Sequence, residues 1–491
     1  MFAHLSLGTP TGSRRLLVAI ATLLVMPLAA EAKTLYVNAA TGNDATTYAA
    51  NSEATPWRSI GRAAAGSTDR LSSNANEAAR AGDVVLISGG TYVTIGNLTG
   101  GGFGRQDVAY NPVNNGAAGN PIRFECTATC QLTFSSGAGP MIGSMDRNYI
   151  EWSGFTINEA TAPSRGDTGP VTFFRAVGGS IENSTLIGNP NWTERVGDNY
   201  TGVRLEDAMG VRIAGNRIRD FGGQTGDRNH AGIETYRSAP LLIENNEIVN
   251  CGSGIYLKAY ANVVQTGRVR YNAILNNRYG INVLLQPFTS AQPMLIYQNI
   301  FTGNREAGLW INAFNNGDTD AKWIRFFNNT LVNNASAVAT YNWAAFPAGA
   351  NLLFWNNIMA GTGNRVRQDN TDAVGSNQKD RHDFDRNLYE TATIEVGGAA
   401  RTMAYWQGLG QDTSAVVAGP GFVNASDYHL TPGSPARTVG RALYGIGGGS
   451  GTVVPAGAYI TGNEMIGAAG GAPSSQLPSA PTGLRIIGSG Q

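Results

Sequence analysis

The chain has little charge and very few cysteines or histidines for its 491 residues. Asp, Glu, Lys and Arg make up only 14% of it, and there are three Cys and four His. Three cysteines are too few for a disulfide scaffold, and the Cys/His spacing of a zinc site is absent. We expect Cys126 and Cys130 to bridge a loop and Cys251 to be a small buried residue.

An excess of positive charge is also missing. Lys and Arg number 35, as do Asp and Glu, so the chain lacks the basic footprint of a nucleic-acid-binding protein. Its many glycines do not form a nucleotide-binding pattern between a strand and a helix. We therefore expect no nucleic-acid partner and interpret the glycines as turn residues.

Long apolar runs are absent except near the N-terminus. Arg14 and Arg15 precede the apolar run from Leu16 to Ala30, and the small residues up to Ala32 suit cleavage before Lys33. A membrane-spanning helix needs about 20 apolar residues, more than this run offers. We expect residues 1–32 to be a signal peptide and the protein to be secreted, to the periplasm or beyond, without a membrane partner.

A short repeat dominates the middle of the chain. Glycine followed by an aliphatic residue opens five similar segments, 22 to 30 residues apart, in a composition that is poor in helix formers. These segments are GVRLED from 202, GIETYR from 232, GIYLKA from 254, GINVLL from 280 and GLWINA from 308. The pattern predicts one short strand in each turn of a coil.

A second series of segments, built around asparagine, alternates with the first. It has seven copies between 181 and 361, among them IENNEIVN from 243 and FNNTLVNN from 327. Asparagine tolerates the left-handed backbone conformation and can bond to another asparagine, so it suits a corner repeated in every turn. Unrelated turns in an antiparallel β-sandwich are the alternative, which seven copies in one hydrophobic context disfavour. The sequence predicts an all-β fold, a single right-handed parallel β-helix.

The two ends of the chain differ from this repeat. Residues 33–100 combine strand patterns with an Ala-rich helix, as expected of a cap on the open end of a solenoid plus its first coil. We predict the β-helix itself over 101–471, with an irregular C-terminal segment that closes the other end and includes the stretches from 383, 403 and 419. Residues 472–491, rich in Ser, Pro and Gly, read as a linker or a disordered tail.

These features resemble a known family. The opening LYVNAATGND, the AGDVVLISGGTY segment, the Asn-rich coils and the closing GFVNASDYHLTPGSPA are similar to secreted bacterial right-handed parallel β-helix proteins of the pectate lyase-like kind. Many members of that family are polysaccharide lyases, glycoside hydrolases or epimerases. The resemblance implies a carbohydrate-active protein but not one activity, since one fold carries several chemistries.

Strand alternation predicts which side chains point outward. If the aliphatic residue after each glycine faces the core, the next residue faces out, and so does the one two further on. The first outward column is Arg204, Glu234, Tyr256, Asn282 and Trp310, and the second is Glu206, Tyr236, Lys258, Leu284 and Asn312. Charged and aromatic residues gather on three neighbouring coils, which makes this patch the candidate active site.

Two long polar loops enter the same region. Residues 189–201 and 220–231 are longer than a solenoid corner requires, and such loops often hold binding residues. They bring Asp198, Asp227, Arg228 and His230 to the rim of the predicted site.

A polysaccharide lyase acting on a uronate is the first hypothesis. Lys258 would remove the C5 proton if its pKa were lowered towards about 7 to 8, and Tyr236 or His230 would protonate the leaving oxygen. Arg204 would neutralise the uronate carboxylate, or Ca²⁺ would do so. Arg204, Tyr256, Trp310, Asn282 and Arg228 would bind substrate, and the candidate calcium ligands are Glu206, Asp207, Glu234 and Asp227. Neighbouring glutamates oppose this scheme because they favour the charged lysine.

Two other functions fit the same residues. In a glycoside hydrolase Glu206 and Glu234 would be the catalytic pair, with Lys258 binding substrate. In a non-catalytic β-helix the patch would bind a glycan or another protein. Each side chain has an ordinary role too, as a surface ion pair, a solvated lysine or an aromatic cover over the sheet. We expect an acidic polysaccharide as the partner and a monomeric protein.

Overall fold

The structure is a computed structural model that describes most of the chain. The described residues are 31–68, 72–95, 108–136, 140–161, 169–191, 199–222, 229–258, 266–284, 293–312, 323–341, 352–361, 363, 366–368 and 382–468. The chain divides into two compact units, Met1–Glu31 and Ala32–Gln491, and every helix and strand described lies in the second. The predicted signal peptide, except for Glu31 and Ala32, and the predicted tail 472–491 lie outside the described residues.

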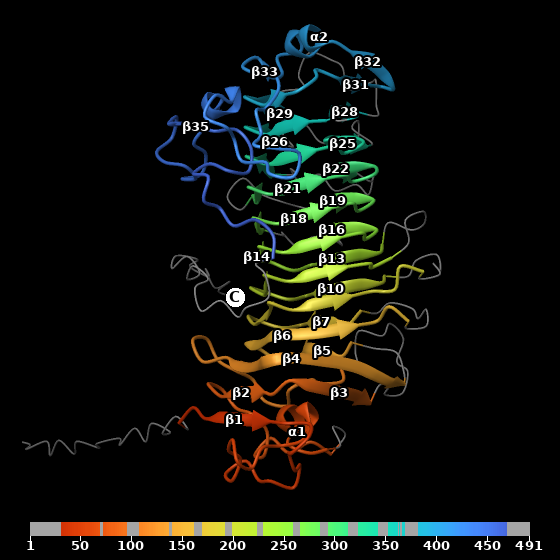
Figure 1. Ribbon diagram of the computed structural model, residues 1–491, viewed down its shortest axis with the longest axis vertical. Coiled ribbons are helices and arrows are strands. Elements are labelled where there is room, and N and C mark those ends of the chain that lie inside the picture. Colours follow the sequence, from red (N-terminus) through yellow and green to blue (C-terminus); the bar gives the residue numbers. More distant parts are fainter. Residues whose placement is uncertain are drawn as a thin grey trace, which may run out of the picture. The chain divides into compact units, whose positions relative to one another are not determined.

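Each coil of the second unit contains three short strands. In one coil these are β13 (Ala231–Tyr236), β14 (Leu241–Glu244) and β15 (Glu247–Val249). The next coil repeats them as β16 (Ser253–Lys258), β17 (Gly267–Arg270) and β18 (Ala273–Leu275), each parallel to its counterpart. The stack of coils forms a parallel β-helix, as predicted (Figure 1).

The strands make up three series, and the coils stack in chain order. The series that carries the candidate site, here called sheet B, comprises β5 (Ile142–Met145), β7 (Val171–Phe174), β10 (Thr201–Glu206), β13, β16, β19 (Tyr279–Leu284), β22 (Ala307–Asn312), β25 (Val338–Tyr341), β28 (Val366–Gln368) and β31 (Ile394–Val396), with β32 (Ala399–Arg401) antiparallel to β31.

The other two series share a 22-stranded sheet, here called sheet A. The first comprises β4 (Ile122–Ser136), β6 (Ile150–Asn158), β8 (Ser180–Glu182), β11 (Arg212–Ala214), β14, β17, β20 (Met294–Tyr297), β23 (Ile324–Phe327), β26 (Leu352–Trp355) and β29 (His382–Asp385). The second comprises β9 (Thr185–Ile187), β12 (Arg217–Arg219), β15, β18, β21 (Ile300–Thr302), β24 (Thr330–Val332), β27 (Ile358–Ala360), β30 (Leu388–Tyr389) and β33 (Val416–Val417).

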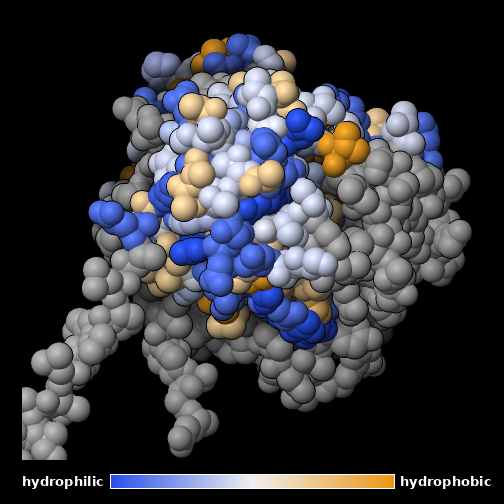
Figure 2. Space-filling model, turned by 90° about the horizontal axis from the view of Figure 1, so that it is seen from below, coloured by the Kyte–Doolittle hydropathy of each residue, from blue (hydrophilic) through white to orange (hydrophobic). Residues whose placement is uncertain are grey.

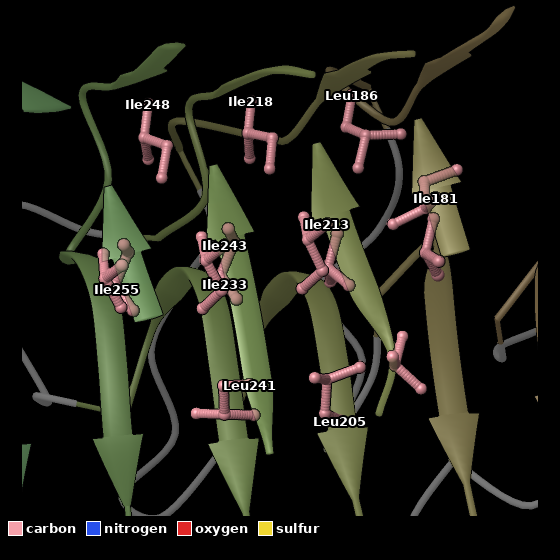
Figure 3. Packing of buried hydrophobic residues seen from close by; sticks show 14 of the residues in the cluster. Ile181, Leu186, Leu205, Ile213, Ile218, Ile233, Leu241, Ile243, Ile248 and Ile255 are labelled. Atoms are coloured by element: carbon pink, nitrogen blue, oxygen red, sulfur yellow. The ribbon is translucent and has the colours of Figure 1, made fainter. Parts of the chain in front are cut away.

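The core lies inside the coils and consists of stacked aliphatic and aromatic columns. Ile213 pairs with Ile243 and Ile218 with Ile248 in adjacent coils, and all four are fully buried. Figure 3 shows these columns facing the inward side chains of sheet B, such as Ile255. Each coil completes the burial of its neighbour, so the fold depends on stacking.

The repeated glycine has a steric cause. A Cβ on Gly232 would lie 2.6 Å from Cγ2 of Ile248 and 2.9 Å from the carbonyl oxygen of Gly254. Glycine and the following aliphatic residue therefore both face the interior, so the alternation shifts at this point. One consequence, absent from the sequence prediction, is a third outward column, one residue before each glycine: Thr201, Ala231, Ser253, Tyr279 and Ala307.

The asparagine corners have the two properties that the sequence suggested. The first corner residue is left-handed, as at Asn245 with φ 55°. The second is buried and bonds to the next coil: Asn299 Nδ2 donates to Asn329 Oδ1 at 3.0 Å, and Asn272 Nδ2 donates to Asn299 Oδ1 at 2.9 Å. This ladder supplies partners to the backbone groups that the corner exposes.

The N-terminal end of the stack is covered by a cap. It contains β1 (Thr34–Val37), α1 (Ile60–Ala65), β2 (Val84–Ile87) and β3 (Gly90–Ile95). Asn51 accepts a hydrogen bond from the backbone of Tyr36 and donates one back, which satisfies the free edge of β1. Seen from this end, the coloured surface is mostly hydrophilic (Figure 2).

The C-terminal segment agrees with the prediction in its first part and differs from it in its last part. The end of the stack is closed by α2 (Met403–Gly408), whose Trp406 packs on His382 and Phe384. The later stretch does not close that end: it contains η4 (Pro435–Thr438), β34 (Gly440–Arg441) and β35 (Val453–Val454) and returns along the outside of sheet A. Its contacts follow the corner residues of successive coils: Asn356 bonds to Arg441, Asn328 to Pro455, Gln298 to Glu464 and Asn245 to Met465.

The cysteines behave as predicted. Cys126 and Cys130 form a disulfide within β4, and Cys251 is free and buried. Burial raises the pKa of the Cys251 thiol to about 12, so this residue is a packing group. Among the described helices, none has the length and apolar character needed to cross a membrane.

Candidate functional site

The two predicted outward columns of sheet B are confirmed by the strand register. Arg204 pairs with Glu234 and Glu234 with Tyr256, followed by Asn282 and Trp310. In the second column Glu206 pairs with Tyr236 and Tyr236 with Lys258. The structure therefore brings the charged residues of three coils together on one face.

This face is covered, which the sequence analysis did not predict. Arg204, Glu206 and Glu234 are buried, and Lys258 keeps only 12% of its side chain exposed. Lys258 ends β16, yet its ammonium group bonds to Asn199 and Asn229, which precede β10 and β13. The two loop ends must therefore fold back over the outer face of the sheet.

Six side chains form what we call the charged cluster: Arg204, Glu206, Asp207, Glu234, Arg237 and Lys258. Arg204 lies at its centre and donates to Oε2 of Glu206 and to Oε2 of Glu234, each at 3.2 Å. Its guanidinium also lies 4.8 Å from the ring centre of Tyr236. The cluster contains three positive and three negative side chains, so its net charge is zero, and buried charges are normally paired in this way.

Arg237 is a member of this cluster that the sequence analysis missed. It donates to both oxygens of Asp207, at 2.6 and 2.8 Å, and to Oε1 of Glu206 at 3.2 Å. The hydrogen bond to Asp207, with the charges of Asp207 and Glu206, raises the pKa of Arg237 far above its usual range. The repeat alignment, which sets Arg237 opposite Asp207 of the preceding coil, was the signal that could have found it.

The described residues around Lys258 include uncharged oxygens, aromatic rings and the Glu234 carboxylate. Its Nζ lies 2.9 Å from Oδ1 of Asn229, 3.2 Å from Oδ1 of Asn199 and 3.7 Å from Oε1 of Glu234. It also lies 4.6 and 5.3 Å from the ring centres of Tyr236 and Tyr256. A lysine held in this way can serve as a proton acceptor or as a carboxylate-binding group.

His230 is fully buried, and the edge of its ring meets the Tyr200 ring, with centroids 6.2 Å apart. Its chain neighbour Asn229 accepts a hydrogen bond from Lys258. The loops singled out by the sequence thus do reach the site, but through Asn199 and Asn229. Asn199 lies two residues before Thr201 and Asn229 two residues before Ala231, and these two residues pair between β10 and β13. The two asparagines therefore hold equivalent positions in adjacent coils.

The expected sugar-binding side chains lie on the outward face but are covered. Trp310 packs on Tyr279 at 5.2 Å and is only 5% exposed, and Tyr256 is buried. Asn282 bonds to Ser253, in the third outward column. Asp198, Asp227 and Arg228 lie outside the described residues.

The described candidates for calcium do not fit a metal site as they are arranged. Glu206 is bound by Arg204 and Arg237, Asp207 by Arg237, and Glu234 by Arg204 and Lys258. Calcium takes six to eight oxygen ligands, whereas these oxygens face cationic nitrogens. Within the described ranges no group of three His, Cys, Asp or Glu side chains is placed to hold a metal ion.

Comparison with known proteins supports the fold. Residues 171–358 match the family model of the right handed beta helix region, and no curated protein matches the chain. The crystal structure of pectate lyase Pel9A is similar over 88% of this chain and 97% of its own, with a TM-score of 0.51 and 14% identity.

Two further solved structures are less similar. XylC in complex with xylose matches over 78% of this chain and 86% of its own, with 11% identity and a TM-score of 0.45. The PL6 family polysaccharide lyase Pedsa3628 from Pseudopedobacter saltans matches over 80% and 98%, with 12% identity and a TM-score of 0.36. The stacked coils, the strand register and the family match together identify this chain as a protein of the right-handed parallel β-helix fold.

Proposed function

We propose that this protein is a secreted polysaccharide lyase that cleaves a uronate-containing polysaccharide by β-elimination at the charged cluster. The observation that carries the proposal is the position of Lys258. Its side chain, 12% exposed on the outer face of sheet B, donates hydrogen bonds to two neutral amide oxygens. The fold shared with pectate lyase Pel9A supports the same reading.

In the proposed reaction Lys258 removes the C5 proton of the uronate. The electron pair of the C5–H bond forms the C4=C5 double bond, and the C4–O bond to the leaving sugar breaks. Tyr236, whose ring centre lies 4.6 Å from the lysine nitrogen, would give a proton to the leaving oxygen. Tyr236 is preferred to His230 for this step because the imidazole is fully buried against Tyr200.

The uronate carboxylate has to be neutralised for its C5 proton to be lost. Arg204 is buried between two glutamates, whereas Arg237 keeps 29% of its side chain exposed and borders the same patch. Arg237 is therefore the better candidate for this task, and Arg228 remains a predicted substrate-binding residue. The negative charge of Glu234 favours the protonated form of Lys258. Arg204 also pairs with Glu234, and its positive charge offsets part of this effect.

A glycoside hydrolase fits the geometry less well. One of its two carboxyl groups has to carry a proton at working pH and reach the glycosidic oxygen. Glu234, with no exposed surface, lies between the cations Arg204 and Lys258, which oppose protonation. Glu206 is bound by Arg204 and Arg237 and is buried as well.

The test is to incubate the purified protein with polygalacturonate, alginate, glycosaminoglycans and bacterial exopolysaccharides. Ultraviolet absorbance of an unsaturated uronate and the appearance of new reducing ends are followed in the same samples. A lyase produces both signals together. New reducing ends without the absorbance would refute the lyase in favour of a hydrolase, and neither signal on any substrate would favour the binding protein.

A further inference from the structure

Two asparagines hold the amine that the proposed function needs. The ammonium group of Lys258 has three N–H bonds. Among the described residues, two of these bonds have acceptors: the amide oxygens of Asn229 at 2.9 Å and Asn199 at 3.2 Å, neither of which carries a charge. The Glu234 carboxylate forms a longer ion pair with the same nitrogen, at 3.7 Å.

Asn199 and Asn229 come from equivalent places in adjacent coils. Each lies two residues before a position at which β10 and β13 pair, Thr201 with Ala231. Each follows one of the two long polar loops, and Asn199 is buried. Two consecutive coils thus present the same amide to one lysine from a third coil.

A neutral amine keeps two N–H bonds after it loses a proton. Two amide oxygens match those two bonds, so both hydrogen bonds can persist in either protonation state. A carboxylate at the same place would favour the charged form, because an opposite charge within about 4 to 6 Å stabilises it by about 1 to 3 pKa units. Among the described residues, the Tyr236 and Tyr256 rings and Glu234 also face the amine, and Arg204 binds Glu234 as well.

We infer that Asn199 and Asn229 are positioning residues that fix the Lys258 amine through uncharged acceptors and so leave it able to give up a proton. The inference rests on the proposed function for its purpose, but it concerns a property of Lys258 that is measured without substrate. The chemical demand on both positions is an oxygen acceptor without charge. Aspartate, nearly the same in shape, fails that demand.

The experiment is competitive labelling of lysines with acetic anhydride across a range of pH, read by peptide mass spectrometry. The chain has only four lysines, Lys33, Lys258, Lys322 and Lys379, so each is followed separately. Asn229→Asp and Asn199→Asp are compared with the wild type and with Asn463→Asp. Asn463 is an exposed residue of the C-terminal segment that runs along sheet A, so its variant adds the same charge elsewhere.

We expect the pH of half-maximal labelling of Lys258 to rise by about 1 to 3 units in Asn229→Asp and in Asn199→Asp, and to stay unchanged in Asn463→Asp. Lys33 is the internal reference. A Lys258 midpoint that stays at the wild-type value in both site variants, with their folding verified by circular dichroism, would overturn the inference. A shifted midpoint in a protein that forms no unsaturated product would support it and count against the proposed function alone.

Discussion

Replacing Arg204 by methionine removes the guanidinium that joins two buried glutamates. Of the ion pairs among the described residues, Glu206 would keep the one with Arg237, and Glu234, which has no exposed surface, would keep the one with Lys258 at 3.7 Å. Breaking a buried ion pair from one side costs about 3 to 5 kcal/mol, since a desolvated charge loses its partner. We expect the free energy of unfolding of Arg204→Met to fall by about that amount, with little change in the shape of the side chain.

The double variant Arg204→Met/Glu234→Gln is the matched control. It removes one charge of each sign, so we expect it to recover about 2 kcal/mol of the loss, as coupled neighbours do. Urea unfolding followed by both tryptophan fluorescence and circular dichroism measures the two values. A loss below about 1 kcal/mol for Arg204→Met would refute the reasoning, because it would show a cluster solvated as a surface ion pair is.

Three further predictions concern the corner ladder, the end of the stack and metal dependence. Asn299→Leu should lower the free energy of unfolding by at least about 2 kcal/mol. Buried corner groups such as the Asn272 N–H would lose their hydrogen-bond partner, and each unsatisfied group costs about 1 to 3 kcal/mol. The exposed Asn463→Leu should change it by less than about 0.5 kcal/mol, and equal losses in the two would contradict the ladder. Burial raises the pKa of Asp412 to about 6, above the value near 4 of an unfolded chain, so the protonated form is the stabilising one. Urea unfolding should show the wild type losing stability relative to Asp412→Asn as pH rises from about 4 to 6, and parallel profiles would contradict this. EDTA should leave the lyase activity unchanged, because arginines and Lys258 already bind the carboxylates of the charged cluster; a loss reversed only by Ca²⁺ would refute that expectation.

Much of the fold was predictable because each coil places the same steric and hydrogen-bonding requirements on the same residues of the repeat. Glycine before an aliphatic residue recurs where a Cβ would meet the carbonyl oxygen of the next coil, and asparagine recurs where the corner needs a left-handed residue and a ladder. These demands are local and identical in each coil, so sequence alone shows them. The return of the C-terminal segment along sheet A was not predictable, since it depends on contacts such as Gln298 with Glu464, 166 residues away.

For the candidate site, the outward columns were predictable and their surroundings were not. Alternation and register placed Glu206, Tyr236 and Lys258 side by side, as the structure confirms. Burial of the face, and the hydrogen bonds of Lys258 to the asparagines, depend on where the loop ends at Asn199 and Asn229 lie over the sheet. The repeat does not determine the direction that a loop takes. The sequence therefore indicates a role for Asn199 and Asn229 only through their equivalent positions in adjacent coils.

The most direct test of the central claim is the formation of unsaturated product by Lys258→Arg. Arginine keeps a positive charge near the same place but is not deprotonated in proteins, so it cannot act as the base. Lys33→Arg, on a lysine that bonds to the backbone oxygens of Tyr48 and Ala49, is the matched control and should behave as the wild type does. We expect Lys258→Arg still to bind the polysaccharide while its rate of elimination falls by about 10²-fold or more. Elimination at the wild-type rate in Lys258→Arg would contradict the account.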